Sequence, residues 1–134
     1  MSKFFLAEPA PGSIMLTIEV IEDDIAMRTL ISEWLHAEGY CVRAESRIGT
    51  ERRTDVDLVV MNLGNLHLDG IEDVRRVRQL YANAALIGVS TQVSRTLAAD
   101  SDQARHLGLV GLVSKPCRSS ELLSAVADAI GPAT

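Results

Sequence analysis

The amino-acid sequence predicts an α/β fold, a three-layer sandwich in which a five-stranded parallel sheet lies between two layers of helices. Short apolar, β-branched segments alternate along the chain with segments in which apolar residues recur every three or four positions. The apolar segments are continuous rather than alternating with polar residues, as expected of strands that helices cover on both faces. Five such strand and helix units follow one another, a pattern typical of a parallel sheet.

The first half of the domain begins with two predicted strands, at residues 16–21 and 40–44. The helix between them has one apolar face, formed by Met27, Leu30, Ile31, Trp34 and Leu35. Asp24 is placed to cap the first turn of this helix, and Gly39 follows its end. Residues 46–55 have little apolar periodicity, so any helix after the second strand is short or poorly packed.

The second half of the domain repeats the alternation of strand and helix. Three further apolar segments are predicted as strands, at residues 57–61, 85–90 and 109–113. A helix with clear apolar spacing is predicted at residues 71–81, and residues 119–130 form the closing helix. Residues 92–106, which include Leu97 and Ala98, are predicted as a weak helix.

Length and composition limit the classes of function. The chain has 134 residues, 47% hydrophobic and 23% charged, which suits one domain with its own apolar core. The formal net charge is −5, so the chain has no basic field to hold a nucleic-acid backbone. No apolar stretch approaches the ~20 residues of a membrane span. Cys41 and Cys117 have no metal-ligand spacing. We therefore expect a cytoplasmic protein that binds neither nucleic acid nor membranes.

The expected domain organisation is simple. Residues 1–14 are expected to form a Pro- and Gly-punctuated extension, 15–131 the domain and 132–134 a short tail. The apolar run before Glu8 is shorter than the ~7–15 residues of an export signal. A chain of this length leaves no room for a second catalytic or output domain, so we expect a stand-alone protein that acts alone or through a partner.

Polar side chains stand where the predicted strands end. Glu22 and Asp23 follow the first strand, Asn62 follows the third, Ser90 ends the fourth and Lys115 follows the fifth. Binding groups in parallel sheets collect at the carboxyl ends of the strands. Clustered carboxylates repel one another unless a hard cation such as Mg²⁺ lies among them. A lysine and a hydroxyl nearby could hold the oxygens of a phosphoryl group.

Four short motifs occur in order at these strand ends: Val-Ile-Glu-Asp-Asp at 20–24, Asp-Leu-Val-Val-Met-Asn at 57–62 followed by Asp69-Gly70, Val89-Ser90, and Lys115-Pro116. With these motifs the chain resembles the receiver domain of bacterial response regulators, the signalling module of two-component systems, from about residue 16 to residue 130. The resemblance implies a flavodoxin-like topology, in which the five parallel strands have the order 2-1-3-4-5.

The resemblance also implies a metal site. The acidic pair, here Glu22 and Asp23, would hold Mg²⁺ together with the backbone carbonyl of Gly64. The position at which the family supplies a further carboxylate is Asn62, which is neutral. Mg²⁺ binding is therefore expected to be weak, and no organic cofactor is implied.

The phosphorylation machinery departs from the family pattern, above all at the phosphate acceptor and at the switch position. In the family an aspartate that ends the third strand accepts phosphate from a histidine kinase, whereas this chain has Asn62. An amide is a weak nucleophile and cannot form an acyl phosphate. Ser90 and Lys115 match the positions that contact the phosphoryl group, while Leu112 stands where the family places a switching Tyr or Phe.

These features predict a pseudo-receiver, a two-component or phosphorelay protein that acts through protein–protein contacts, is not phosphorylated at Asn62 and is no enzyme. The expected partner is a histidine kinase, a phosphotransfer protein or a downstream effector. An alternative is an ordinary phosphorylatable receiver that carries an engineered Asp-to-Asn substitution. A third hypothesis, a small phosphate-ester hydrolase or transferase using Asp23 or Asp24, is disfavoured because Asn62 supplies no nucleophile.

Apolar residues around the fifth strand allow two interpretations. Leu107, Leu109, Val110 and Leu112 could form an exposed patch, which would support a homodimer through the face of the fourth helix, fifth strand and fifth helix. They could equally be part of the strand core. The sequence leaves both interpretations open.

Overall fold

The computed structural model describes residues 15–64, 68–92, 97–98, 101–115 and 117–133, so the predicted extension at 1–14 lies outside the described residues. Five strands pair in parallel in the order β2-β1-β3-β4-β6. Their bounds are Thr17–Ile21 for β1, Cys41–Glu45 for β2, Leu58–Asn62 for β3, Ala85–Ser90 for β4 and Gly111–Ser114 for β6. The predicted fold class and strand order are therefore confirmed.

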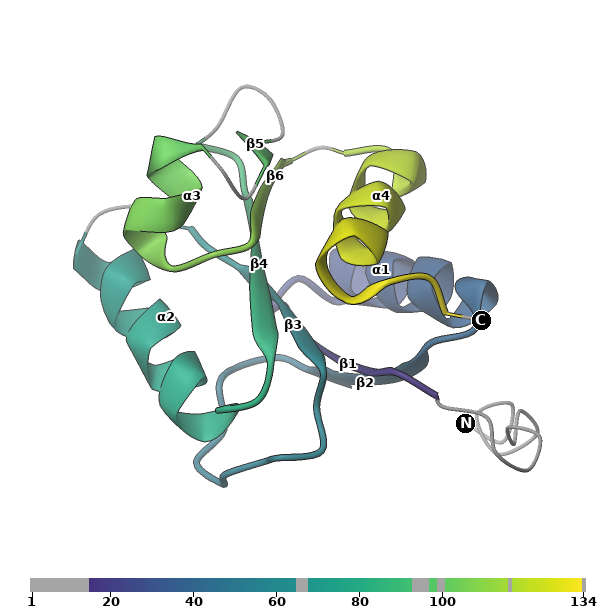
Figure 1. Cartoon of the computed structure of the whole chain (residues 1–134), viewed down its shortest axis with the longest axis horizontal. Coiled ribbons are helices and arrows are strands. Elements are labelled where there is room, and N and C mark those ends of the chain that lie inside the picture. The colour runs from purple at the N-terminus through teal and green to yellow at the C-terminus, as the bar shows by residue number, and fades with distance from the viewer. Residues whose placement is uncertain (1–14, 65–67, 93–96, 99–100, 116, 134) are drawn as a thin grey trace.

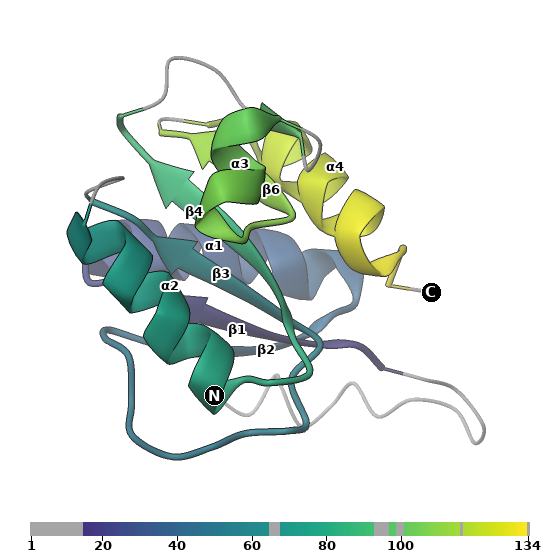
Figure 2. The same cartoon turned by 60° about the vertical axis from the view of Figure 1, so that its left-hand side comes forward.

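Helices cover both faces of the sheet, which makes the three layers of the sandwich (Figures 1 and 2). One face carries α1 (Ile25–Glu38) and α4 (Ser119–Ile130), and the other carries α2 (Leu68–Leu80) and α3 (Asp102–Leu107). Each face has its own apolar core, because the alternating side chains of the strands point to opposite sides. None of the helices in the described residues is both long and apolar enough to cross a membrane.

The predicted caps of the first helix are confirmed. Asp24 Oδ2 accepts a hydrogen bond from the backbone N–H of Met27 at 3.1 Å, and Gly39 ends the helix in the left-handed region with φ 107°. Trp34 packs against the core of this face, as the apolar stripe predicts, whereas Leu30 of the same stripe is 41% exposed. The cap matters for the site, because it fixes the chain direction directly after the acidic residues that follow β1.

The predicted helix at residues 92–106 is wrong at Leu97 and Ala98 and is confirmed only from Asp102 on; residues 93–96 and 99–100 lie outside the described residues. Leu97–Ala98 forms a short strand, β5, which pairs antiparallel with β6 at the edge of the sheet. The helix α3 begins only at Asp102, because the Ser101 side chain accepts a hydrogen bond from the N–H of Ala104 at 3.1 Å and caps it there. Backbone pairing with β6 overrides the weak helical spacing of Leu97 and Ala98.

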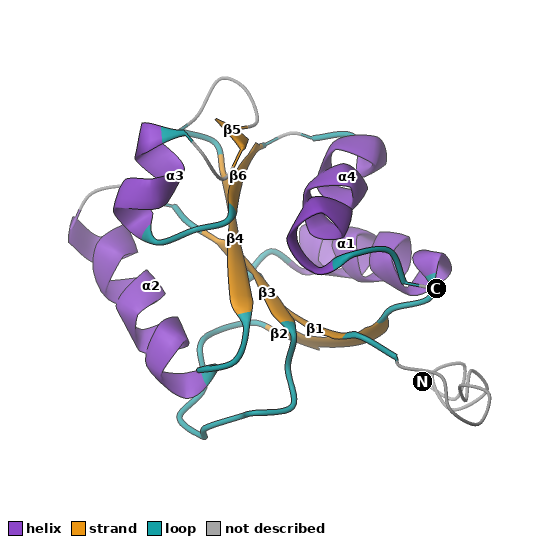
Figure 3. Cartoon of the chain, viewed as in Figure 1, coloured by secondary structure: helices purple, strands orange, loops and turns teal. Residues whose placement is uncertain are grey.

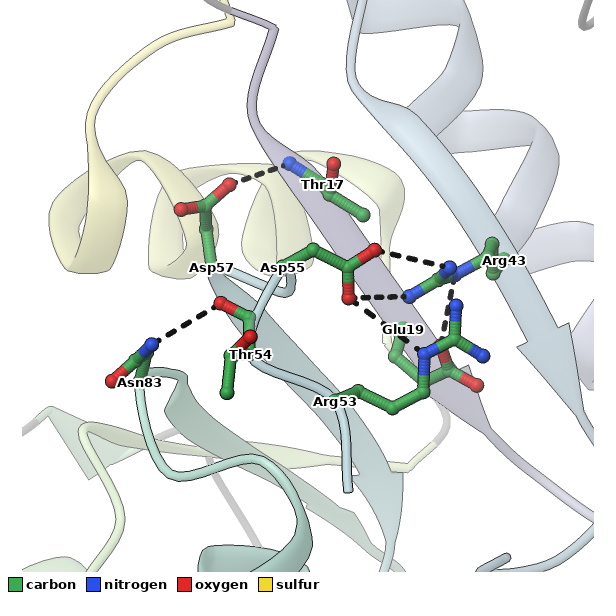
Figure 4. Close-up of polar contacts among 8 residues, drawn as sticks. All are labelled: Thr17, Glu19, Arg43, Arg53, Thr54, Asp55, Asp57 and Asn83. Carbon is green, nitrogen blue, oxygen red and sulfur yellow. Dashed lines mark hydrogen bonds and ion pairs between the residues drawn. The ribbon is translucent and has the colours of Figure 1, made fainter. Parts of the chain in front are cut away.

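The crossover from β2 to β3 contains no helix at all, although each of its residues 46–57 is described (Figure 3). Polar backbone contacts hold this loop in place. The Arg53 N–H donates to the carbonyl of Leu80 at 2.7 Å, and Asn83 Nδ2 donates to the carbonyl of Thr54 at 3.2 Å (Figure 4). The buried Val56 anchors the loop to the core. The sequence predicts that any helix here is short or poorly packed; the structure has no helix between β2 and β3, and a loop connects the two strands.

Of the two interpretations of the apolar residues beside the fifth strand, the structure supports the core. Leu107, Leu109 and Leu112 are buried in the core between the sheet and α2 and α3, and only Val110 is partly exposed, at 36%. The interpretation of these residues as core is confirmed.

Candidate functional site

Three of the predicted site residues meet at the carboxyl edge of the sheet. The ammonium group of Lys115, directly after β6, donates to Glu22 Oε1 at 2.8 Å and to Asn62 Oδ1 at 2.9 Å. Glu22 follows β1, and Asn62 is the last residue of β3. Since β1 and β3 are neighbours in the sheet, their ends place the two acceptors on either side of one cation.

Glu22 is almost fully buried, with 2% of its surface exposed. A buried carboxylate is tolerated only when other groups compensate its charge. Here Lys115 does so at Oε1, and the backbone N–H of Asp24 donates to Oε2 at 3.1 Å. The Lys115–Glu22 ion pair is therefore a structural element of this edge as well as a candidate binding group.

Ser90 and Leu112 occupy different environments. Ser90 is fully buried at the end of β4, and its hydroxyl accepts a hydrogen bond from the N–H of Gln92 at 3.0 Å. Its carbonyl accepts from the N–H of Lys115 at 2.8 Å, which ties the end of β4 to the lysine. Leu112 lies in the core with no exposed surface, so it does not reach the edge where Lys115, Glu22 and Asn62 meet.

A cavity of about 490 Å³ opens beside Asn62. Its lining includes the predicted metal-site residues Asp23 and Gly64 together with Ser46 and Asp73. Ser46 belongs to the helix-free crossover, so this part of the wall comes from the loop that replaces a helix. The structure thus places Asp23, Asn62 and Gly64 around one cavity, whereas Glu22, the other predicted metal ligand, is not among its described lining residues.

Comparison with known proteins places this arrangement in a family. The model of the response regulator receiver domain matches residues 18–127. The chain belongs to this family. It is therefore a receiver-domain protein of two-component signal transduction.

Relatives of known name agree with this assignment. The chain is 32% identical over 116 residues to a protein-glutamate methylesterase/protein-glutamine glutaminase of Nitrobacter winogradskyi, a match that covers 82% of this chain and 27% of that protein. It is 27% identical over 114 residues to the chemotaxis protein CheY of Bacillus subtilis, covering 81% of this chain and 92% of that protein. The chain thus spans less than two thirds of the methylesterase and nearly all of the chemotaxis protein.

Solved structures show the same fold. A response regulator from Thermotoga maritima superposes with a TM-score of 0.69 at 21% identity, covering 87% of this chain and 98% of that chain. A response regulator receiver domain protein from Clostridium thermocellum gives a TM-score of 0.67 at 24% identity, covering 87% of this chain and 94% of that chain.

Receiver domains commonly bind Mg²⁺ at this edge. The donors here are oxygens, which suit a hard cation: the Glu22 and Asp23 carboxylates, the amide oxygen of Asn62 and the backbone carbonyl of Gly64. Two of these donors, Glu22 and Asn62, already accept hydrogen bonds from Lys115. Within the described ranges no group of three or more His, Cys, Asp or Glu side chains is placed to hold a metal. The donor set therefore suits Mg²⁺ in kind, but with little negative charge.

A second polar cluster, which the sequence interpretation missed, lies under the helix-free crossover (Figure 4). Glu19, in the middle of β1, has no exposed surface and faces Arg43, its register partner on β2, with Oε1 3.3 Å from Nε. Arg43 also pairs with Asp55 of the crossover at 3.3 Å, and Asp55 with Arg53 at 3.7 Å. The available signal was an acidic residue inside an otherwise apolar strand.

The Glu19 carboxyl is an unusual titrating group. Burial raises the pKa of Glu19 from 4.5 to about 7; the neighbouring Glu45 carboxylate adds to the rise, and Arg43 opposes it. Neither carboxylate oxygen of Glu19 has a hydrogen-bond partner among the described residues. Burial, and then the charges of Glu19 and Glu45, raise the pKa of Tyr81 on the same side of the sheet to about 12. This cluster makes the stability of the chain depend on pH near neutrality.

Proposed function

We propose that this receiver signals through protein contacts and without phosphorylation at position 62. The observation that carries the proposal is the identity and geometry of Asn62, which ends β3 and accepts a hydrogen bond from Lys115 at 2.9 Å. The amide stands where the family has its phosphate acceptor, and it has no oxygen that can attack a phosphodonor and keep the phosphoryl group. The ammonium group of Lys115 donates to both Glu22 and Asn62.

The partner contact that we propose lies at the start of α1. Ile25 and Leu30 are 68% and 41% exposed, and they are two of the three large hydrophobic side chains exposed in the described part of the chain. Ile25 directly follows the acidic residues at the end of β1. Exposed apolar side chains beside a charged edge are typical of a protein interface. A histidine kinase, phosphotransfer protein or downstream effector is the proposed partner.

Weak Mg²⁺ binding is part of the same proposal. Glu22, Asp23, the Asn62 amide oxygen and the Gly64 carbonyl would hold the ion, which would offset the repulsion between the two carboxylates. Calorimetric titration with MgCl₂ tests this; we expect weaker binding to the wild type than to Asn62→Asp, whose added carboxylate raises the negative charge. Equal or tighter binding to the wild type would contradict the proposal. The cytoplasmic location stays a prediction, supported by two free cysteines.

Phosphoryl transfer from a small donor tests the proposed function directly. The wild type, Asn62→Asp and Asn83→Asp are each incubated with acetyl phosphate and Mg²⁺, and their intact masses are measured. We expect one added phosphoryl group on Asn62→Asp and none on the wild type or on Asn83→Asp. Asn83 lies far from Lys115, so Asn83→Asp controls for the change of residue type. A phosphoryl group on the wild type would contradict the proposal.

Two alternatives have separate tests. An ordinary receiver with an engineered substitution would also keep Lys115 beside position 62, so the codon at position 62 in the encoding gene decides between natural and introduced asparagine. A phosphate-ester hydrolase acting through Asp23 or Asp24 would release phosphate from p-nitrophenyl phosphate. We expect no release above that of Asp23→Asn.

A further inference from the structure

A groove separates α2 from α3, which lie side by side on the same face of the sheet (Figures 1 and 2). It has a volume of about 420 Å³ and lies apart from the edge where Lys115 meets Glu22 and Asn62. The groove combines an apolar base with a basic rim, and its main lining side chains are Ile71, Val74 and Leu107 in the base and Arg75, Arg78 and Arg105 at the rim. Three arginines on two helices thus surround one apolar depression.

This concentration of positive charge contrasts with the formal net charge of −5 of the whole chain. Arg75 and Arg105 each have one partner on their own helix, Glu72 at 3.0 Å and Asp102 at 3.2 Å. These pairs are exposed and use one of the five N–H donors of each guanidinium, so most donors stay available to another acceptor. Arg78 has neither an ion pair nor a hydrogen bond with any residue that the structure describes.

The Arg78 guanidinium lies against Gly108, the residue that ends α3 with φ +80°. The guanidinium lies where a side chain at position 108 would begin, so the glycine admits it to the groove. Arg78 is not required to cap α3, because the carbonyls of Ala104 and Arg105 already accept hydrogen bonds from the N–H groups of Leu109 and Gly108. The guanidinium therefore reaches across the groove with its donors uncommitted.

We propose that the groove between α2 and α3 binds an acidic segment of a partner protein that carries an apolar side chain between its carboxylates. Guanidinium groups bind carboxylates with two parallel hydrogen bonds, and the base of Val74 and Leu107 provides a surface for the apolar side chain. The described residues that line the groove include no Phe, Tyr or Trp and offer a nucleobase only the imidazole of His106 to stack on, so a protein segment suits it better than a nucleotide.

This inference rests on the proposed function only in assuming that the chain acts through a protein partner. Its residues are separate from Asn62, Glu22 and Lys115, so the two proposals have independent readouts. Failure of peptide binding would leave the phosphoryl-transfer result unchanged, and phosphorylation of the wild type would leave peptide binding unchanged.

The test uses a fluorescein-labelled peptide, Asp-Glu-Leu-Asp-Glu-Leu, and its Asn/Gln analogue, with fluorescence anisotropy as the readout. We expect the acidic peptide to bind wild type with a dissociation constant below about 1 mM, and binding to weaken with added NaCl. Arg78→Glu should weaken binding at least about tenfold, as reversal of a central charge does. Arg52→Glu, an exposed arginine of the β2–β3 crossover, is the matched control and should change it by less than about twofold.

Circular dichroism checks that each variant is folded, and Arg75→Glu serves in its place if Arg78→Glu does not fold. Equal binding of the neutral analogue, equal loss in Arg52→Glu, or no binding of the acidic peptide at about 1 mM would overturn the proposal. ATP that binds in place of the peptide would identify a phosphate site instead. Self-association in sedimentation velocity that is lost in Arg78→Glu would identify a second copy as the occupant and would likewise overturn the partner assignment.

Discussion

Glu19→Gln is the substitution whose effect the structure predicts in most detail. Glu19 has no exposed surface, lies in the middle of β1 and has one close cation, Arg43, at 3.3 Å. The substitution keeps the shape of the side chain and removes its charge. Because burial raises the pKa of Glu19 in the folded chain from 4.5 to about 7, the folded state holds a proton that the unfolded state has released at intermediate pH.

The sign of the pH dependence follows from this difference. Between pH 4.5 and about 7 the folded chain binds more protons than the unfolded chain, so the contribution of Glu19 to the free energy of unfolding falls as pH rises. At about 1.4 kcal/mol per pKa unit, the full loss amounts to about 3 kcal/mol. The contribution is complete below pH 4.5 and lost above about pH 7.

Urea unfolding, followed by the fluorescence of Trp34, measures this effect across the pH range from 4 to 8. The difference in free energy of unfolding between Glu19→Gln and wild type should move in favour of the variant by about 3 kcal/mol over this range. Asp55→Asn is the control, because Asp55 also pairs with Arg43 but is 64% exposed, and it should change stability by less than about 1 kcal/mol. A Glu19→Gln difference that stays constant with pH would refute the reasoning.

Three further predictions concern stability and are measured by the same unfolding assay. Lys115→Met leaves the Glu22 carboxylate buried without its cation and should lower the free energy of unfolding by about 3–5 kcal/mol. The added change Glu22→Gln should restore most of this loss, and equal losses in the single and double variants would contradict the prediction. Leu112→Ala opens a cavity in the core and should lower the free energy of unfolding by about 2–5 kcal/mol, whereas Val110→Asp should lower it by less than about 1 kcal/mol. Val110→Asp should also leave the size-exclusion volume unchanged; a later elution of this variant would show that the wild type dimerises through this face. Gly108→Ala forces an alanine to a positive φ against Arg78 and should lower the free energy of unfolding by about 1 kcal/mol or more. An unchanged midpoint of urea unfolding would contradict this prediction and show that the backbone relaxes freely.

The parts of the fold that follow from local rules were predictable from the sequence. The strand at Ala85–Ser90 and the helix at Ser119–Ile130 have the predicted bounds, because each is set by a continuous apolar run or a clear apolar face. The cap at Asp24 depends on neighbours only three residues apart. Lys115, Glu22 and Asn62 meet because parallel strands end at one edge, so topology alone brings them together.

The features that depend on long-range packing were not predictable. Leu97 and Ala98 are extended because β6 offers an open edge, which no local pattern reveals. The burial of Leu107 and Leu109 depends on how α2 and α3 cover the sheet, so their sequence suits either an exposed patch or a core. Glu19 is buried beneath a loop, at a place where any helix was expected to be short or poorly packed, and its pairing with Arg43 requires the register of β1 and β2.

The central claim is that Asn62 keeps this receiver from responding to a phosphoryl group. Two-dimensional ¹H–¹⁵N NMR with Mg²⁺ alone and then with added beryllofluoride, a phosphoryl mimic, tests it most directly. The account predicts that beryllofluoride causes no further shift of the backbone amide signals of Asn62, Ser90 and Lys115 in wild type, whereas Asn62→Asp shows a saturable one. A saturable, Mg²⁺-dependent response of the wild type to beryllofluoride would contradict the account.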